Sequence, residues 1–422
     1  MLTDLYPPVI GGLEIHVRNL SADLVARGHA VTVATLDQGN APASETDAQG
    51  IAVRRIRGTL QRAAGLFSDS QRQFAPPFPD PEATLALRRI IAETRPQIIH
   101  AHNWLLHSYL PLDRRAGPKI VASLHDYGLV CARRDLINGG AVCGGPGAGK
   151  CLACATAHFG AARGIPTALA TRLGGFAARS RVAQFMPVSD AVARGNGLRA
   201  GHDRFRIVPN FIPDDVADGH EDYTAYLAQL PERPFLLFVG ALIPIKGIEV
   251  LLRAYSALTD APPLVLIGAR WPTSPMTFPP GVTVLEDWPH GAVMAAWRRS
   301  LLGIVPSIWA DPCPTVALEA MLVGKPVVAS HIGGLSDIVA PGETGLLVPP
   351  GDADALAAAL RDLYSDPARA ARFGAAGEAR VRARFVASAV IPQIETVYRQ
   401  VLGVAATPEV ERIAALATGD CG

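Results

Sequence analysis

A lysine in the second half of the chain has the setting of a phosphate-binding residue. Lys246-Gly247 follows an apolar run and a turn that starts at Gly240, and it precedes a helix predicted over 248–257. An ammonium group at the end of a strand can pair with an oxyanion bound there. A solvated surface lysine is the alternative. Because lysine is rare in this chain, we favour the binding role.

Two carboxylates further on could hold the hydroxyl groups of a ligand. Asp311 lies in a predicted loop, and Glu319 follows eight residues later in the helix that Thr315 is predicted to begin. Such a pair can accept hydrogen bonds at two places on one extended ligand. A charge at a helix N-terminus and a surface glutamate would show the same spacing, so both interpretations stay open.

The first half offers glycines and histidines. Gly11-Gly12 opens a predicted helix, where exposed backbone N–H groups can approach a phosphate or a sugar, although a tight strand-to-helix turn would look the same. His100, His102 and His107 gather near the end of one predicted strand. No carboxylate joins them at the spacing of a metal site. We therefore expect these histidines to line a cleft.

A glycine-rich loop carries four cysteines, in a chain that has only six. Cys131, Cys143, Cys151 and Cys154 end in a C-x-x-C pair, which suits a tetrahedral zinc ion or, less readily, an iron–sulfur cluster. Unliganded thiols are the alternative. We expect a structural metal in this insert, over 131–154.

Short apolar runs alternate with helical patterns along the chain. Unbroken apolar runs indicate parallel strands covered by helices on both faces. The pattern predicts two doubly wound α/β domains, over 1–210 and 211–422, with a ligand cleft between them and the last helix packing back on the first domain. The predicted strands are 31–35, 53–56, 98–101, 120–124, 185–188, 206–208, 235–239, 264–267, 282–285, 303–305, 326–329 and 345–348.

The first strand has little room, because only a few residues precede the loop at Gly11-Gly12. Strands usually run about 5–6 residues. Either the sequence starts downstream of the true beginning, which we favour, or the domain tolerates an unusually short central strand.

Composition excludes several classes of protein. Of 422 residues, 49% are hydrophobic and 18% charged, which argues against a disordered chain. Lys+Arg number 39 and Asp+Glu 38, so no basic field would recruit nucleic acid. No apolar run reaches the roughly 18 residues of a membrane span, and no signal peptide is recognisable. We expect a cytoplasmic protein.

One stretch departs from the balanced charge. No acid occurs between Asp135 and Asp190, whereas several arginines do, and 165–185 is rich in alanine, leucine and phenylalanine. A basic, apolar helix could rest on the anionic inner face of the cell membrane as a peripheral contact. A helix packed on the sheet with solvated arginines is the alternative.

Together these motifs resemble the group 1 family of GT-B-fold retaining glycosyltransferases. The residues that carry the likeness are Gly11-Gly12, Lys246-Gly247, the Asp311/Glu319 pair and the run from Glu319-Ala320-Met321 through Gly324-Lys325-Pro326 to Gly333-Gly334. A similar cysteine-bearing insert occurs in a subset of that family. The resemblance implies two Rossmann-like domains facing across a cleft, with the acceptor on the first and a nucleotide-sugar donor on the second.

The resemblance also implies roles. Lys246 would neutralise the donor diphosphate, Asp311 would contact the donor sugar, and Glu319 would hold the ribose hydroxyls. His125 is similar to the family's catalytic histidine beside the transferred sugar, and no metal or other cofactor is required for transfer. Gly11, Gly12, Gly240 and Thr315 complete the expected donor site, and His102 and Asn103 are expected to face the acceptor.

Two positions depart from the family pattern. The first acid is usually glutamate but here is Asp311, and Ala241 stands where an arginine is common. Arg270 is a candidate replacement for that lost cation. The implied function is transfer of a sugar, with retention, to a hydroxyl of a polysaccharide or lipid-linked glycan intermediate. The alternatives are a GT-B nucleotide-sugar epimerase, whose acid/base pair we do not identify, and a non-catalytic sugar-nucleotide-binding scaffold.

Overall fold

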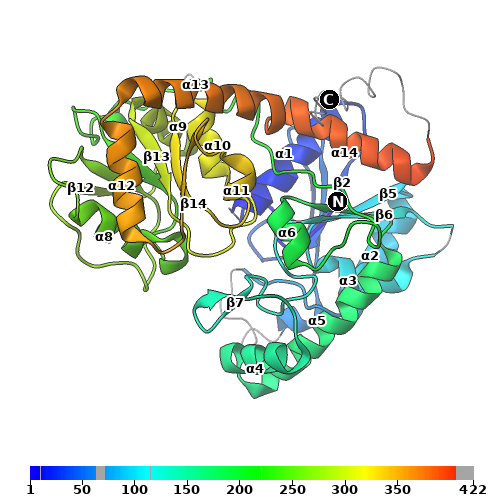
Figure 1. Ribbon diagram of the computed structural model, residues 1–422. Helices are drawn as coiled ribbons and strands as arrows, with labels where there is room; N and C mark the ends of the chain where they lie inside the picture. Colours follow the sequence, from blue (N-terminus) through cyan, green and yellow to red (C-terminus); the bar gives the residue numbers. More distant parts are fainter. Residues whose placement is uncertain (10, 63–71, 115, 220, 405–422) are drawn as a thin grey trace. The chain divides into compact units, whose positions relative to one another are not determined.

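The computed structural model describes the whole chain except residues 10, 63–71, 115, 220 and 405–422. The chain divides into two compact units (Figure 1). Unit 1 comprises Met1–Pro209 with Val390–Gly422, and unit 2 comprises Asn210–Ala389. The sequence places the boundary after residue 210 and expects the last helix to return to the first domain.

Unit 1 is built on a seven-stranded sheet in the order β3-β4-β2-β1-β5-β6-β9. Every neighbouring pair is parallel except β3 with β4. The strand order reverses between β1 and β5, which is where ligands bind in doubly wound folds. The strands are β1 (Leu2–Thr3), β2 (Thr32–Leu36), β3 (Ser44–Thr46), β4 (Ala52–Ile56), β5 (Ile98–Ala101), β6 (Lys119–Leu124) and β9 (Gln184–Pro187), with a separate hairpin of β7 (Ile137–Asn138) and β8 (Ala141–Val142).

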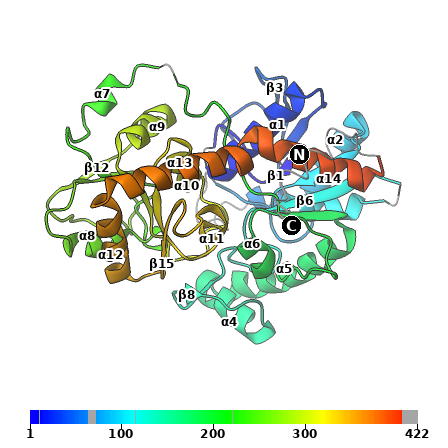
Figure 2. The same cartoon turned by 45° about the horizontal axis from the view of Figure 1, so that its top comes forward.

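Helices complete unit 1, and local signals set their ends. At α2, for example, Asp80 caps the helix by accepting a hydrogen bond from the Ala83 N–H at 3.1 Å. Figure 2 shows α14 crossing over the unit 1 sheet, and there the Tyr398 hydroxyl meets Nδ1 of His100 at 2.7 Å. The helices are α1 (Gly12–Ala26), α2 (Pro81–Thr94), α3 (Leu105–Tyr109), α4 (Ala148–Phe159), α5 (Ala161–Arg181), α6 (Asp190–Gly195) and α14 (Ala387–Leu402), with 3₁₀ turns η1 (Thr59–Arg62) and η3 (Leu110–Leu112).

Unit 2 contains a six-stranded, all-parallel sheet in the order β12-β11-β10-β13-β14-β15. Leu236, Leu264 and Leu302 are fully buried between the sheet and its helices. The strands are β10 (Leu236–Val239), β11 (Leu264–Ile267), β12 (Val282–Leu285), β13 (Leu302–Val305), β14 (Val327–Ser330) and β15 (Gly345–Val348). The helices are α7 (Thr224–Leu227), α8 (Ile248–Ser256), α9 (His290–Arg299), α10 (Thr315–Leu322), α11 (Leu335–Ile338), α12 (Ala353–Tyr364) and α13 (Pro367–Arg384), with the 3₁₀ turn η4 (Pro244–Lys246).

The apolar runs predict the parallel strands other than the two-residue β1 to within a residue or two, with one error. The run over 206–208 is not a strand. The backbone N–H groups of Arg206 and Val208 donate to the carbonyls of Phe185 and Pro187, so the run lies beside β9. Just before the run, Phe205 forms an isolated bridge with Phe185, which is too short to extend the sheet.

Candidate active site

In unit 2, Lys246 and Asp311 form a short ion pair. Nζ of Lys246 lies 2.5 Å from Oδ2 of Asp311. Lys246 ends the η4 turn after β10, and Asp311 lies in the loop after β13. These two strands are neighbours at the point where the order of the sheet reverses, so the pair occupies the usual ligand position of a doubly wound domain.

Glycines let these two loops approach each other. Gly247 has a φ of +77°, and a Cβ there would collide with the Pro306 carbonyl at the end of β13. Cβ atoms at Gly333 and Gly334 would likewise strike the backbone that carries Asp311. The Gly334 N–H donates to the Asp311 carbonyl at 2.8 Å. Because these positions are glycine, the backbone segments around Lys246 and Asp311 can pack more closely than larger residues would allow.

Glu319 lies on α10, eight residues after Asp311, and its partner is His290, which the sequence did not indicate. Its Oε1 is 3.0 Å from Nε2 of His290, the first residue of α9. Glu319 is 7% exposed, so its carboxylate is largely withdrawn from water. The hydrogen bond to Glu319 raises the pKa of His290 above its ordinary value. Thr315 begins α10, as predicted, and α10 carries Glu319.

Arg270 forms an ion pair with Glu286 in unit 2. Its Nε lies 2.9 Å from Oε1 of Glu286, and its guanidinium stands over the Phe278 ring. Gly240, the first residue of the turn, has a φ of +145°, and its carbonyl leaves no room for a Cβ at Gly268. Arg270 thus has an acidic partner of its own, and its suggested role as replacement cation stays a prediction.

In unit 1, three histidines meet above the ends of β5 and β6. Nδ1 of His102 lies 3.0 Å from Nε2 of His125, and the His16 ring centroid is 5.0 Å from that of His125. Burial, and secondarily the charge of the neighbouring imidazoles, lowers the pKa of His16 and of His102 well below the ordinary value. These two rings are therefore neutral hydrogen-bonding groups at neutral pH. Sequence reasoning gave His16 no role, because its place in the cluster depends on the packing of α1.

The other two histidines are almost fully buried, and His100 lies in the wall of a hollow that Tyr398 also lines. His100 is 1% exposed, and its ring nitrogens contact the Tyr398 hydroxyl and, at 2.8 Å, Oγ of Ser123. His107 is 4% exposed, and a Cβ at Gly174 of α5 would touch its ring. Both belong to the interior of unit 1, because β5 and α3 are covered there.

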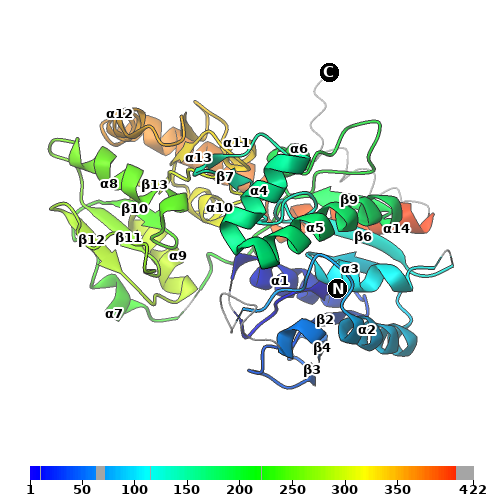
Figure 3. The ribbon, with the colours of Figure 1, turned by 90° about the horizontal axis from the view of Figure 1, so that it is seen from below.

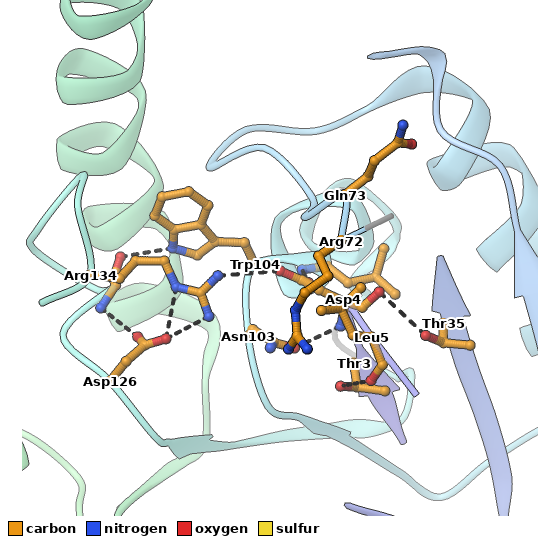
Figure 4. Close-up of polar contacts among 12 residues, drawn as sticks. Thr3, Asp4, Leu5, Thr35, Arg72, Gln73, Asn103, Trp104, Asp126 and Arg134 are labelled. Atoms are coloured by element: carbon orange, nitrogen blue, oxygen red, sulfur yellow. Dashed lines mark hydrogen bonds and ion pairs between the residues drawn. The ribbon is translucent and has the colours of Figure 1, made fainter. Parts of the chain in front are cut away.

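Asn103 belongs to a buried polar network at the end of β1 (Figure 4). Its Oδ1 accepts the Asp4 N–H at 2.8 Å, while Oδ1 of Asp4 accepts the Leu105 N–H at 2.8 Å. Oδ2 of Asp4 has no hydrogen-bond partner among the residues that the structure describes. It lies 3.8 Å from Nη1 of Arg134, which also pairs with Asp126. Burial raises the pKa of Asp4 to about 6, against the opposing effect of Arg134. Asp4 directly follows β1 at the switch point, and this position in the sequence could have identified it as a candidate site residue.

Gly11 and Gly12 lie at the start of α1 and differ in their surroundings. A Cβ at Gly11 would collide with the Glu14 carboxylate, which pairs with Arg72 at 3.0 Å. The helix N-terminus thus already carries a buried anion, as its dipole favours. A Cβ at Gly12 would meet nothing within 4 Å, so the backbone there is open to approach.

The four cysteines of the insert surround one hollow, together with Arg133 and Lys150. Their sulfur atoms make local contacts: the Cys154 thiol donates to the Ile137 carbonyl at 3.7 Å, and Sγ of Cys151 accepts the Gly147 N–H at 3.3 Å. Within the described part of the chain, no three His, Cys, Asp or Glu side chains are arranged to hold a metal ion. A bound zinc or iron–sulfur centre at Cys131, Cys143, Cys151 and Cys154 stays a prediction, which metal analysis of the purified protein would test.

The chain has two Rossmann-like units, each with polar residues at its switch point, and its fold is of the GT-B class. The family model for group 1 glycosyl transferases matches residues 224–380, and the model for glycosyltransferase family 4 matches residues 10–216. Each of these glycosyltransferase models matches part of this chain, and the fold is that of the GT-B class.

Known relatives match the chain over nearly its whole length. It is 26% identical to a glycogen synthase of Mycobacterium tuberculosis over 418 residues, covering 90% of this chain and 89% of that protein. It is 27% identical to the GDP-mannose-dependent alpha-(1-6)-phosphatidylinositol monomannoside mannosyltransferase of Mycolicibacterium smegmatis, covering 89% and 92%. The fold matches the sucrose-phosphate synthase structure from Thermosynechococcus elongatus with a TM-score of 0.71 and 24% identity, covering 95% and 96%.

Proposed function

We propose that the protein transfers a sugar from a nucleotide-sugar donor to a hydroxyl acceptor with retention of the anomeric configuration. The observation that carries this proposal is the Lys246–Asp311 pair at the switch point of unit 2, followed on α10 by Glu319. A cation beside a hydroxyl-binding carboxylate, with a second carboxylate further along, matches the diphosphate, sugar and ribose of such a donor.

Each residue would act on a different part of the donor. As the bond to the sugar breaks, negative charge grows on the leaving diphosphate, and the Lys246 ammonium would stabilise that charge. Asp311 would accept hydrogen bonds from hydroxyls of the donor sugar. Glu319 would accept those of the ribose, which requires its Oε1 to exchange His290 for a ligand hydroxyl. Because Lys246 supplies the positive charge, we expect transfer to proceed in the presence of EDTA.

Two imidazoles of unit 1 suit the acceptor side of the reaction. His102 and His125 can take part in hydrogen bonds, and a neutral His102 brings no charge that would compete for the diphosphate. Nε2 of His102 is buried and has no hydrogen-bond partner among the described residues, so it could bind a hydroxyl group that reaches it. The names of the two relatives support a polysaccharide or lipid-linked glycan intermediate as the acceptor.

A donor screen tests the proposal first. The melting temperature would be measured with UDP-, GDP-, ADP- and dTDP-sugars, because a ligand that binds only the native state stabilises it by mass action. The stabilising donor would then be incubated with candidate acceptors, and the anomeric configuration of the product determined by NMR. We expect transfer with retention in the wild type and none in Glu319→Ala.

The alternatives give different outcomes. A nucleotide-sugar epimerase would isomerise the donor without an acceptor and without lasting release of nucleotide. A scaffold that only binds sugar nucleotides would be stabilised by the donor but would release no nucleotide with any acceptor. Product with inverted configuration would contradict retention while leaving glycosyl transfer in place.

A further inference from the structure

Helix α5 of unit 1 turns its large apolar side chains outward. The exposed fractions are 41% for Ile165, 54% for Leu169, 71% for Leu173 and 76% for Phe176. The residues that α5 buries are small: Gly164, Thr171, Gly175 and Ala178. A helix on the surface of a water-exposed domain normally shows the opposite arrangement, with its large apolar residues facing the core.

Packing fixes this orientation. A Cβ at Gly175 would collide with the Leu129 carbonyl, and one at Gly164 would collide with the Ala155 backbone of α4. A Cβ at Gly174 would lie 2.7 Å from the Pro77 carbonyl. The glycine face of α5 therefore fits closely against its neighbours. The helix cannot rotate to bury its leucines without bringing side chains into these contacts.

The exposed residues form one stripe. Their spacing of four, four and three residues places them on the same side of the helix. Figures 1 and 3 show α5 running along the outside of unit 1 with α4 beside it. We define the α5 face as Ile165, Leu169, Leu173 and Phe176.

The charged side chains that α4 and α5 themselves carry are all positive. Residues 136–189 contain no aspartate or glutamate. Lys150 and Arg172 are exposed, and neither has an acidic partner among the residues that the structure describes. Further along α5, Arg179 and Arg181 pair with acids from outside this stretch, Asp203 and Asp113.

We propose that the α5 face is a docking surface for an anionic lipid bilayer. The apolar stripe would enter the boundary between headgroups and acyl chains, and Lys150 and Arg172 would lie at the level of anionic headgroups. A second copy of the chain is a poorer occupant, because it would bring a face of the same positive charge against this one. Among the described residues, no helix is long and apolar enough to span a bilayer, so the contact is peripheral. The proposal does not depend on the chemistry of the acceptor.

Vesicle flotation tests the proposal. The full-length protein would be mixed at low salt with vesicles of phosphatidylcholine alone or with a third of phosphatidylglycerol. We expect binding to the anionic vesicles only, weakened by high salt. Two single variants are matched: Leu173→Gln removes an exposed leucine of the α5 face, and Leu85→Gln removes a leucine of α2 with an exposed fraction of 56%. Binding should fall about tenfold for the first and stay unchanged for the second.

Two further measurements complete the test. The variant Leu169→Gln/Leu173→Gln/Phe176→Gln should lose vesicle binding yet melt within about 2 °C of the wild type, because all three side chains are exposed. The proposal is overturned if the wild type does not float with anionic vesicles at low salt, or if Leu173→Gln binds as Leu85→Gln does. Self-association in sedimentation velocity that the triple variant abolishes would assign the face to a second copy instead.

Discussion

Nζ of Lys246 and Oδ2 of Asp311 lie 2.5 Å apart on loops that leave the neighbouring strands β10 and β13. Asp311 is 6% exposed, so its charge would be costly without this cation. The ion pair therefore keeps a cation and a hydroxyl acceptor side by side at the switch point before any donor binds. Such pre-organisation is what stabilisation of a leaving group requires.

Replacing Lys246 should separate the chemical role of the pair from its structural role. We expect Lys246→Met to lower kcat/KM by about 10²–10³-fold, through the loss of charge stabilisation on the leaving group. It should also cost about 1–3 kcal/mol of stability, because the buried Asp311 loses its partner. Steady-state kinetics and urea unfolding would measure the two effects.

The double variant Lys246→Met/Asp311→Asn and the control Lys119→Met complete this experiment. The double variant should recover much of the lost stability, because no unpaired carboxylate remains, but none of the activity. Lys119 is exposed at the start of β6 in unit 1, and its replacement should change neither quantity. Full activity in Lys246→Met would remove this residue from the proposed mechanism.

Replacing two glycines of the site by alanine should change the stability of the protein to different extents. Gly247→Ala should destabilise the protein by about 2 kcal/mol or more, because its positive φ and the Pro306 carbonyl both oppose a Cβ. Gly12→Ala should leave stability within about 1 kcal/mol, since alanine suits a helix and the space there is open.

Activity then shows whether the open backbone at Gly12 is used. We expect Gly12→Ala to lower kcat/KM about tenfold, equivalent to one weakened hydrogen bond to the ligand. Normal kinetics in a stable Gly12→Ala variant would reduce the Gly11-Gly12 motif to a strand-to-helix turn.

The sequence predicted the elements better than the partners of the side chains. Unbroken apolar runs such as 264–267 mark buried parallel strands because both faces are covered, and the structure has these strands. The turn at Lys246-Gly247 and the helix start at Thr315 follow from local signals. The contact between His290 and Glu319 does not, because it joins α9 to α10 through tertiary packing.

The orientation of α5 was also beyond the reach of the sequence. Helical periodicity alone would place Leu169, Leu173 and Phe176 against the core, since large apolar residues usually lie there. The structure exposes them because Gly175 lies directly against the Leu129 backbone. A close glycine contact of that kind depends on the partner segment, which no local pattern specifies.

Asp4 should make the protein less stable at neutral than at mildly acidic pH. Its pKa is about 6 in the folded state, above the ordinary value, so the folded protein binds its proton more tightly than the unfolded chain does. The stability that Asp4 contributes is present below the unfolded pKa near 3.8 and is lost as pH rises through about 6. Asp4→Asn should remove this dependence and be more stable at pH 8 by up to about 3 kcal/mol.

Urea unfolding at pH 5 and pH 8 would measure the effect of Asp4→Asn. Asp218→Asn, at an exposed position in unit 2, is the matched control and should leave the pH dependence unchanged. If Asp4→Asn were less stable than the wild type at both pH values, the ion pair with Arg134 would outweigh the burial of the carboxylate.

His107 should have the opposite pH dependence to Asp4. Burial lowers its pKa from 6.5 to about 4, so the folded protein keeps the ring neutral while the unfolded chain takes up a proton below pH 6.5. Stability is therefore lost as pH falls from 6.5 towards 4, by about 3 kcal/mol from this residue. In His107→Gln the loss between pH 7 and pH 4.5 should be smaller than in the wild type, whatever the absolute stability of the variant. His202→Gln, at an exposed histidine of the same unit, should keep the wild-type slope. An unchanged slope in His107→Gln would mean that the ring is already protonated, or already solvated, in the native state.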